Sequence, residues 1–569
     1  MNVVLGKVLK PQLRERDTHN LGKSLLAQLI DFCLVKKRSP TFFLFQHEQF
    51  QPFVFFLEIQ LQEGSYMTVR RSVSESSKPA FAYHTDQIRD WSLAADDQWT
   101  HWAVPFEKAR ELLDAALDLD VVKPWSYRNA LAYALRTQSD YDDPFRLSKH
   151  VGKHAEWKPF LAHILGLDSE LVSRIYDIEA TIEEQLALAK SLRNTAGGSE
   201  TLDQVRGVVE IAQRDVEQLS KELADFNLGP SEARTTRALV GDVDKQIAVL
   251  NDERYAVETD KARIIGALEQ RISVNLQTLE SIFAQANIYF GEQIRRDYSA
   301  LERFNKELVE ERDGYLRDEL SELDAKARDL EAELSNLNEK RTEALQSLSN
   351  AEAIASYKAL TRRLSHRQAE FEILRLRQKS VEELLAIRQA IRELEAEKLA
   401  TQARLERSLV QTEGVYGDIR RSLDDVVFRV IGRHGNMYTE VNKEGHPDFH
   451  AEIVDSEGQP TSAAEGFSYG RLLCIAFDMA MLRTYSSRKY PHFVYHDGVL
   501  ETLDDRKKLN LLDTIRAYAS VGTQHIITVI DAELPVDARG ERISFGEEEI
   551  ILRLHDVDDS GRLFHMPAW

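Results

Sequence analysis

The spacing of apolar residues changes twice along the chain. Up to residue 168, runs rich in aromatic and β-branched residues, such as TFFLFQHEQFQPFVFFLEIQL at 41–61, predict strands, here with a turn near Pro52. EKARELLDAALDLD and YRNALAYALRTQSDY in the same stretch predict amphipathic helices. Beyond residue 425, VVFRVIGRH, MYTEVNKEG and DFHAEIVDSEG predict a small antiparallel sheet, and PHFVYHDG and QHIITVID predict buried strands between helices. Both ends of the chain are therefore expected to have α/β structure.

The stretch between these ends has a heptad pattern. Apolar residues of the return segment alternate spacings of four and three at Leu316, Leu320, Leu323, Ala327, Leu330, Leu334 and Leu337. This pattern is typical of a coiled coil, and two arms of similar length predict a chain that goes out, reverses and pairs antiparallel with itself. We place the outgoing arm at 169–283 with a break near 227–233, the reversal at 284–304 and the returning arm at 305–424. The alternative, a parallel homodimeric rod, fits less well because globular halves flank the coil on both sides.

The prolines agree with this division. Eight of the 14 lie between Pro11 and Pro159 and five between Pro447 and Pro567, whereas Pro230 alone lies between the two groups. The length of 569 residues predicts about four domains at roughly 150 residues each, but compact domains need turns. The sequence therefore favours one α/β unit, split into an N-terminal lobe at 1–168 and a C-terminal lobe at 425–569, with a long helical insertion.

The charge and the cysteine content limit the kinds of protein and the cellular compartments that fit this sequence. The formal net charge of −21 argues against a protein that coats nucleic acid through bulk positive charge. Only Cys33 and Cys474 are present, both in apolar runs, so neither a disulfide framework nor a zinc site is expected within one chain. Nothing in the sequence resembles a signal peptide or an uninterrupted apolar stretch of about 20 residues. We expect a cytoplasmic protein without membrane contact.

The sharpest N-terminal motif is DTHNLGKSLLAQLIDF at 17–32. Gly22, Lys23 and Ser24 before an apolar helix match the end of a phosphate-binding P-loop, in which Lys23 reaches the β and γ phosphates and Ser24 binds Mg²⁺. Asp17 stands where the full pattern requires glycine. The alternative is a chance GKS tripeptide in a loop.

Further motifs follow in order some 450 residues later. EGFSYGRLL at 465–473 resembles the signature sequence of ABC-type ATPases, and FVYHDG is an apolar strand ending in Asp497, as a Walker B strand does. LDD supplies Asp504 at the spacing of a D-loop, and QHIITVID ends a second apolar strand. Each motif alone has a structural alternative: a helix cap for Ser468 or Asp504, or an acid in a turn between strand and helix for Asp497.

The architecture and the motif order resemble the SMC, SbcC and RecN class of coiled-coil ABC ATPases across the whole chain. More closely, the chain is similar to SMC-like ATPases of bacterial three-component ABC systems thought to act in conflict with phages and other mobile DNA. The closer resemblance rests on YRNALAYALR with DDPF beyond it, on IYFGEQIRRDY, and on the HDG strand continuing to DDR and ITVIDAELP. The implied fold is a split α/β ABC-type ATPase head with an inserted antiparallel α-helical coiled coil.

The resemblance implies ATP and Mg²⁺ as ligands and a homodimer whose two heads close around two ATP molecules. Ser24 and Asp497 would bind Mg²⁺, Ser468 and Gly470 would contact the nucleotide of the other subunit, and Asp504 would lie at the dimer interface. The remaining implied ATP contacts are Asn20, Gly22, Lys23, Leu25 and the Q-loop candidate Gln138.

Two departures from the class concern hydrolysis. ABC ATPases carry a glutamate directly after the Walker B aspartate, where this chain has Gly498, and Ile530 stands at the switch-histidine position. His496 and Glu501 are the candidates for a base or water-orienting group. The alternatives are a structural histidine at a strand end and a helix-capping glutamate. We therefore expect slow or atypical ATP hydrolysis.

DNA contact is expected from local basic points, without sequence-specific reading. The candidates are Arg70, Arg71, Arg295, Arg296, Arg429 and Arg433. The alternative for each is a solvated face or a local ion pair.

The functional expectation is an SMC-like ATP-binding and ATP-hydrolysing subunit whose heads dimerise on ATP. It would engage double-stranded DNA, either foreign DNA or DNA ends, and regulate a separately encoded effector, together with accessory subunits, in bacterial antiviral defence. The alternatives are a DNA repair or recombination ATPase partnered with a nuclease, and a catalytically degenerate structural scaffold.

Overall fold

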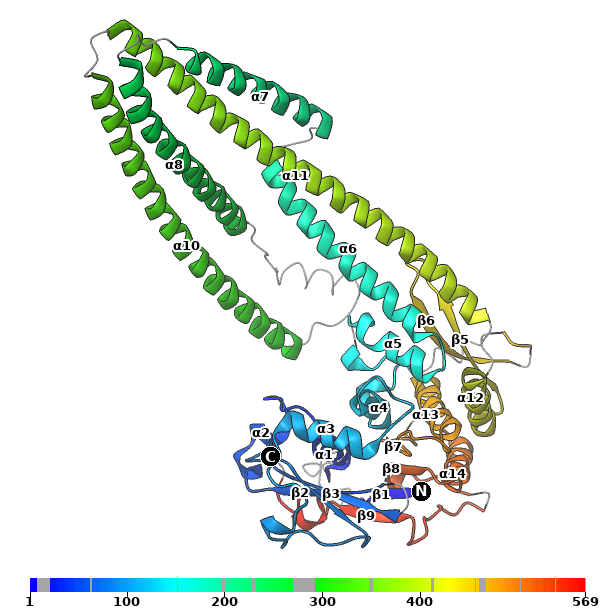
Figure 1. The fold of residues 1–569 in the computed structure, drawn as a ribbon. Helices are drawn as coiled ribbons and strands as arrows, with labels where there is room; N and C mark the ends of the chain where they lie inside the picture. The colour runs from blue at the N-terminus through cyan, green and yellow to red at the C-terminus, as the bar shows by residue number, and fades with distance from the viewer. Residues whose placement is uncertain are drawn as a thin grey trace. The chain divides into compact units, whose positions relative to one another are not determined.

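The chain forms two compact units in a computed structural model (Figure 1). The structure describes residues 1–7, 21–61, 64–150, 152–196, 201–226, 232–269, 292–346, 351–410, 414–455, 457–459, 467–501, 503–537 and 539–567. The first unit joins Met1–Thr181 to Glu395–Trp569, and the second unit is Ile182–Leu394. Both boundaries fall inside long helices, α6 (Ser169–Ala196) and α11 (Ala351–Val410).

The first unit is built on a parallel sheet that takes strands from both ends of the chain. Its order is β7 (Phe493–His496), β8 (Gln524–Ile530), β1 (Asn2–Lys7) and β9 (Ile550–His555). β1 lies between two strands from the far end of the sequence (Figure 1). Because both faces of such a strand are covered, β1 is apolar over successive residues, and its valines are fully buried. The buried strands predicted from PHFVYHDG and QHIITVID are confirmed as β7 and β8.

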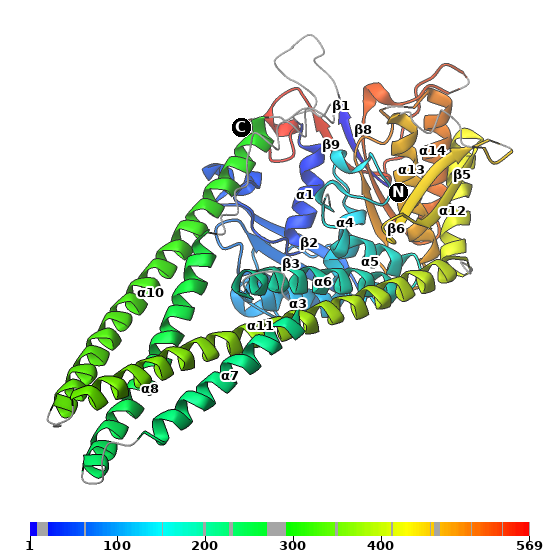
Figure 2. The same ribbon diagram turned by 90° about the horizontal axis from the view of Figure 1, so that it is seen from above.

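Helices from both ends of the chain complete the first unit. α12 (Val415–Ile431), α13 (Phe467–Thr484) and α14 (Asp505–Ala519) lie together near β7 and β8 (Figures 1 and 2). Residues 471–482 of α13 are buried without interruption, so this helix is covered on every side there. The further helices of this unit are α1 (Lys23–Cys33), α2 (Phe43–Gln46), α3 (Phe106–Leu117), α4 (Tyr127–Ala134) and α5 (His154–Ile164).

The first unit also contains two antiparallel sheets, one formed from its N-terminal part and one from its C-terminal part. β2 (Val54–Gln60), β3 (Tyr66–Ser72) and β4 (Ala80–His84) form a meander, and β5 (His434–Val441) pairs with β6 (Pro447–Val454). The hairpin predicted from MYTEVNKEG and DFHAEIVDSEG is confirmed.

Two predicted strands are wrong. The first half of 41–61 forms α2 and a 3-10 helix at Glu48–Phe50, because its phenylalanines pack against one another and against Phe564 from the end of the chain rather than onto a pleated face. VVFRVI, predicted as a strand, is the last part of α12. Its buried valines continue the helical spacing of Leu423 and pack in the core beside α13 and α14.

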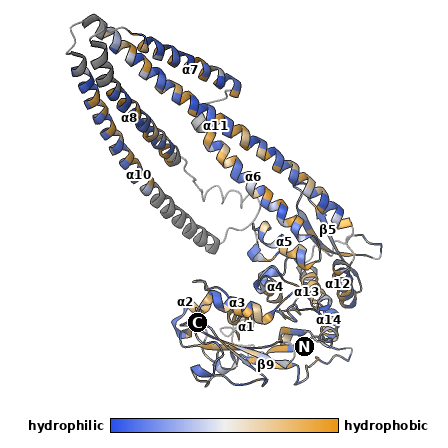
Figure 3. Ribbon diagram, in the orientation of Figure 1, coloured by the Kyte–Doolittle hydropathy of each residue, from blue (hydrophilic) through white to orange (hydrophobic). Residues whose placement is uncertain are grey.

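The second unit consists of paired helices. α7 (Leu202–Ala224) packs along α11, and α8 (Glu232–Glu269) packs along α10 (Glu292–Gln346). Ion pairs join Asp244 to Arg341 at 3.4 Å and Lys261 to Asp324 at 2.8 Å. Residue numbers therefore increase along α8 while those of the partners decrease along α10, so the two helices are antiparallel. All seven predicted heptad positions of α10 are buried or half-buried, with Leu330 and Leu334 buried. Figure 3 shows hydrophilic and hydrophobic residues alternating along these helices.

Parts of the predicted arm lie outside the described residues. These are 197–200, 227–231 and 270–283 of the outgoing arm, 284–291 of the predicted reversal, and 347–350 and 411–413 of the returning arm. Residues 292–304 belong to α10. No helix among the described residues is long and apolar enough to cross a membrane.

Candidate functional site

The start of α1 has a backbone that only glycine accepts without strain. Gly22 caps the helix with φ +93°, in the left-handed region, and a Cβ there would lie 2.8 Å from Leu563 Cβ. The Leu563 N–H donates a hydrogen bond to the Leu21 carbonyl at 3.1 Å, so the end of the chain packs against this turn. No described side chain caps α1, which leaves the first N–H groups of the helix available to an anion.

Lys23, the first residue of α1, is half-buried among carboxylates. Burial lowers the pKa of Lys23, while the charges of Glu533, Asp497 and Glu501 oppose that shift. Burial also raises the pKa of Glu533, and the charge of Glu501 adds to that rise. Acidic groups from the ends of β7 and β8 therefore lie within electrostatic range of one ammonium group. Leu25, two residues on, is half-buried in the same turn, and Asn20 lies outside the described residues.

Ser24 and Asp497 meet although 473 positions separate them. The Ser24 hydroxyl donates to Asp497 Oδ2 at 2.5 Å, and Thr528 Oγ1 donates to Asp497 Oδ1 at 2.6 Å. The Tyr495 hydroxyl donates to the Lys23 carbonyl at 2.6 Å. Tyr495 and Asp497 project to the same face of β7 because they are two residues apart. The parallel sheet thus brings the residues of the predicted P-loop and the predicted Walker B aspartate together.

The Ser24–Asp497 pair fits Mg²⁺. A hydroxyl and a carboxylate are oxygen donors of the kind that this cation prefers, and here they are adjacent, with Ser24 exposed and Asp497 4% exposed. Thr528, which is not among the predicted motif residues, orients the carboxylate and also accepts a hydrogen bond from the Gly498 N–H at 3.0 Å. Its position inside the strand QHIITVID was the available signal, because parallel strands bring neighbouring side chains to one edge.

His496 points away from this site. It follows Tyr495 on the strand and therefore projects to the opposite face, where it is fully buried with its ring 6.1 Å from that of His525. Neither ring nitrogen has a hydrogen-bond partner among the described residues. Burial holds the pKa of His496 well below its usual range. The assignment of His496 as a base or water-orienting group is therefore corrected to a neutral core residue.

Glu501 stays on the side of Asp497. Arg471 Nη1 donates to Glu501 Oε2 at 2.9 Å and to the Gly498 carbonyl at 3.1 Å. The structure does not bear out the alternative of a helix cap, because Asp504 caps α14 through the Lys507 N–H at 3.1 Å. Asp504 also pairs with the Lys507 ammonium at 2.7 Å, and these bonds lower the pKa of Asp504.

The predicted signature lies at the start of α13. A Cβ on Gly470 would lie 3.8 Å from the Asp142 carbonyl and 3.9 Å from that of Tyr141. The Ser468 side chain lies outside the description. Gln138 begins a 3-10 helix (Gln138–Asp140), is exposed, and makes no side-chain hydrogen bond to a described residue.

A buried ion pair fixes the loop that faces Gly470. Arg136 is fully buried and donates to both oxygens of Asp478 on α13, from Nε at 2.8 and 3.0 Å and from Nη2 at 2.9 Å. Its Nη1 donates to the Asp140 carbonyl at 3.0 Å and its Nη2 to that of Pro144 at 2.5 Å. Neither residue was singled out from the sequence, because the two are 342 positions apart and in no motif.

One of the predicted DNA contacts is wrong. Arg71 is 1% exposed and donates to the carbonyls of Phe32, Lys36 and Ser76, so it holds strand β3 against α1. Arg70 lies over the Trp102 ring at 4.7 Å, on the other face of β3.

The other basic candidates are distributed differently. Arg429 pairs with Asp425 at 2.9 Å, and Arg433 is exposed. Arg295 and Arg296 lie in α10, and their side chains lie outside the description. Arg70 and Arg71 thus lie on β3, whereas Arg429 is in α12 and Arg433 follows that helix.

Comparisons with known proteins give a family match for the C-terminal quarter only. Residues 426–568 match a family described as "Uncharacterised protein conserved in bacteria (DUF2326)". No curated protein matches the chain.

Among solved structures, the chain is similar to an Smc head domain with a coiled coil and joint from Pyrococcus yayanosii. The identity is 17% and the TM-score 0.33, over 96% of this chain and 93% of that one. An Smc head domain with an extended coiled coil from Pyrococcus furiosus, bound to the C-terminal domain of ScpA, gives 12% identity and a TM-score of 0.33 over 96% and 91% of the two chains.

Proposed function

We propose that this chain is an SMC-like ABC-type ATPase subunit that binds ATP with Mg²⁺ at the start of α1. The single observation that carries this proposal is the contact of Ser24 with Asp497 beside Lys23, because it unites a P-loop end with the acid at the end of a neighbouring parallel strand. The arrangement of β1 between β8 and β9 supports a head split between the two ends of the chain. The ion pairs of α8 with α10 support an antiparallel coiled coil as the inserted arm.

The residues of the site have distinct tasks in this proposal. The free N–H groups at the start of α1 and the Lys23 ammonium bind the phosphates, and Gly22 lets the backbone approach them. Ser24 and Asp497 hold Mg²⁺, which neutralises charge on the phosphates when bound. Thr528 fixes the orientation of Asp497, and Tyr495 fixes the first turn of α1.

Dimerisation, partners and setting extend the proposal beyond this site. Ser468 and Gly470 contact the nucleotide of a second copy, with Asp504 at the interface, so that two heads close around two ATP molecules. The closed dimer engages double-stranded DNA and regulates a separately encoded effector and accessory subunits in antiviral defence in the bacterial cytoplasm. Gln138 completes the nucleotide contacts from the loop held by Arg136.

The second candidate function is a scaffold whose head has lost catalysis. Gly498 and Ile530 favour it, because they replace the glutamate and histidine that the resemblance leads one to expect. A repair or recombination ATPase partnered with a nuclease uses the same site and differs in its partner.

The first test is Lys23→Ala. Removing the ammonium group should weaken Mg-ATP binding at least tenfold, about 1.4 kcal/mol or more, and abolish ATP-dependent dimerisation. Calorimetry measures the binding and light scattering the mass. The matched control is Lys37→Ala, an exposed lysine of the same unit, which should bind ATP normally. Unchanged ATP binding and dimerisation in Lys23→Ala would overturn the proposal.

A further inference from the structure

The Glu501 side chain fills the space beside the residue after Asp497. Gly498 has φ +62°, and a Cβ built there would lie 2.3 Å from Glu501 Oε1 and 2.6 Å from Glu501 Cδ. Real Cβ atoms do not approach other atoms this closely, and a positive φ is strained for any other residue. The Glu501 carboxylate therefore occupies the space in which a side chain at position 498 would begin.

A buried arginine holds Glu501 in that space. Arg471 is 4% exposed, and one of its nitrogens donates both to Glu501 Oε2 and to the Gly498 carbonyl. The guanidinium also lies over the Tyr141 ring, 5.0 Å from its centre. A planar group fixed by several contacts restricts its partner more than a flexible ammonium does. Glu501 is thus positioned on one side, while about a third of its side chain remains open to water.

The other acidic groups near Lys23 have different surroundings. Both oxygens of Asp497 accept hydroxyl hydrogen bonds from Ser24 and Thr528. Glu533 follows β8, where Lys508 donates to its backbone carbonyl at 2.8 Å. Glu501 alone of the three is held directly over the backbone that follows Asp497. It combines a fixed position, solvent access and proximity to the phosphate-binding lysine.

We propose that Glu501 is the carboxylate that accepts a proton from the attacking water, and that Arg471 is the residue that positions it. This inference rests on the proposed ATPase function. In the step, the water oxygen bonds to the γ-phosphorus as the bond from that phosphorus to the β,γ-bridging oxygen breaks, and the electron pair leaves with ADP. The water proton passes to Glu501 and then to solvent, and inorganic phosphate is released.

The location of Arg471 has a consequence for the two sites of a dimer. Arg471 follows Gly470 directly, so the positioning residue and the predicted signature share the first turn of α13. In the proposed dimer, the nucleotide of the other subunit would therefore contact α13 next to the residue that holds Glu501.

The central experiment exchanges the carboxylate between positions 501 and 498. Glu501→Gln, which keeps the shape of the side chain, should lower kcat at least about 100-fold with ATP affinity within twofold of the wild type. Gly498→Glu alone should also be slow, because its side chain collides with Glu501. The double variant Gly498→Glu with Glu501→Gly, which removes the collision but keeps the strained φ, should turn over faster than Gly498→Glu alone. Turnover of Glu501→Gln within twofold of the wild type would overturn the inference.

The positioning role of Arg471 is tested by measuring kcat and ATP affinity separately in Arg471 variants. Arg471→Met should lower kcat at least tenfold with unchanged ATP affinity, and Arg471→Lys should restore part of the loss; a fall in melting temperature with kcat unchanged would contradict the positioning role. The matched controls are Arg553→Met and Glu547→Gln, an exposed pair of the same unit that should keep normal turnover.

The outcomes separate this inference from the proposed function. A wild-type protein that binds ATP through Lys23 but shows no turnover overturns the role of Glu501 and leaves the ATP site standing. A protein that binds no ATP overturns both.

Discussion

Each of the two units contains an ion pair between an arginine and a carboxylate, and the two pairs have opposite surroundings. In the first unit, the side chains of Arg136 and Asp478 are 0% and 3% exposed. In the second unit, those of Arg206 and Glu382 are 55% and 42% exposed at a distance of 3.2 Å. A buried charge that loses its partner has no water to replace it, whereas an exposed one does. The contrast teaches that an ion pair contributes to folding according to its burial and not its geometry alone.

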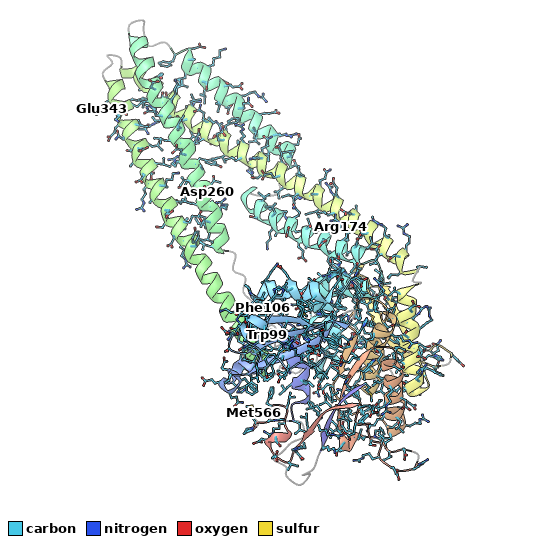
Figure 4. The ribbon with its side chains drawn as sticks, turned by 60° about the horizontal axis from the view of Figure 1, so that its bottom comes forward. Trp99, Phe106, Arg174, Asp260, Glu343 and Met566 are labelled. Carbon is cyan, nitrogen blue, oxygen red and sulfur yellow. The ribbon has the colours of Figure 1, made fainter. Side chains whose placement is uncertain are left out.

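The apolar contacts differ between the two units in the same way, because the first unit buries more of its side chains than the second. The first unit has a continuous core that covers α13 on all sides, and Trp99 and Phe106 lie among dense side chains there (Figure 4). The second unit has a narrow seam, with Asp260 and Glu343 on its helices and one cluster formed by Val205, Val209, Val381 and Leu384. Substitutions in the first unit should therefore cost more free energy of unfolding than comparable substitutions in the second unit.

The largest effect is expected from Asp478→Ala. Arg136 would keep a buried charge without its carboxylate, so the free energy of unfolding of the first unit should fall by about 3–5 kcal/mol. Urea unfolding followed by tryptophan fluorescence measures it, since Trp99 and Trp157 are buried in this unit. The control Glu111→Ala, which removes an exposed partner of Lys108, should change it by less than about 0.5 kcal/mol. Equal losses in both variants would remove the contrast.

A smaller effect is expected from Leu384→Ala in the seam of the second unit. Leu384 is 7% exposed, and its truncation should cost about 2–3 kcal/mol of local stability. Hydrogen exchange of peptides from α7 and α11 should become faster, with exchange in the parallel sheet unchanged. Leu385, the next residue, is 41% exposed and provides the control Leu385→Ala. Similar exchange in the two variants would contradict the assigned seam.

The smallest effect is expected from the exposed pair of the second unit. A double-mutant cycle of Arg206→Ala and Glu382→Ala should give a coupling of about 0.2–1 kcal/mol. Raising the salt concentration should reduce it, because exposed charges are screened. A coupling above about 2 kcal/mol, or one insensitive to salt, would show that the comparison drawn from exposure is wrong.

Much of the site could be predicted because its motifs have local causes. A glycine, lysine and serine before an apolar helix, and an aspartate at the end of an apolar strand, are each readable within a few residues. Their meeting followed from motif order, and the Ser24–Asp497 contact agrees with it.

The residues that sequence analysis missed or misassigned depend on packing between distant segments. Arg471 and Thr528 belong to no spacing pattern, and they matter through the groups that the fold brings beside them. The alternation of side chains along a strand could have indicated that only one of Arg70 and Arg71 is available for a DNA contact, since neighbouring residues on a strand point to opposite faces. The 41–61 stretch is rich in residues that favour strands, yet aromatic packing with the end of the chain overrides that preference.

The position of β1 between β8 and β9 affects how the chain folds during its synthesis. Asn2 at the start of β1 and Gln524 at the start of β8 are 522 positions apart and meet through a side-chain hydrogen bond. At the usual speed of a ribosome, the second strand emerges roughly 25–100 s after the first. During that time the apolar β1 has neither of its neighbours. A nascent chain of this protein therefore carries an unpaired strand until β8 and β9 have been synthesised, and the proposed nucleotide site forms only after that.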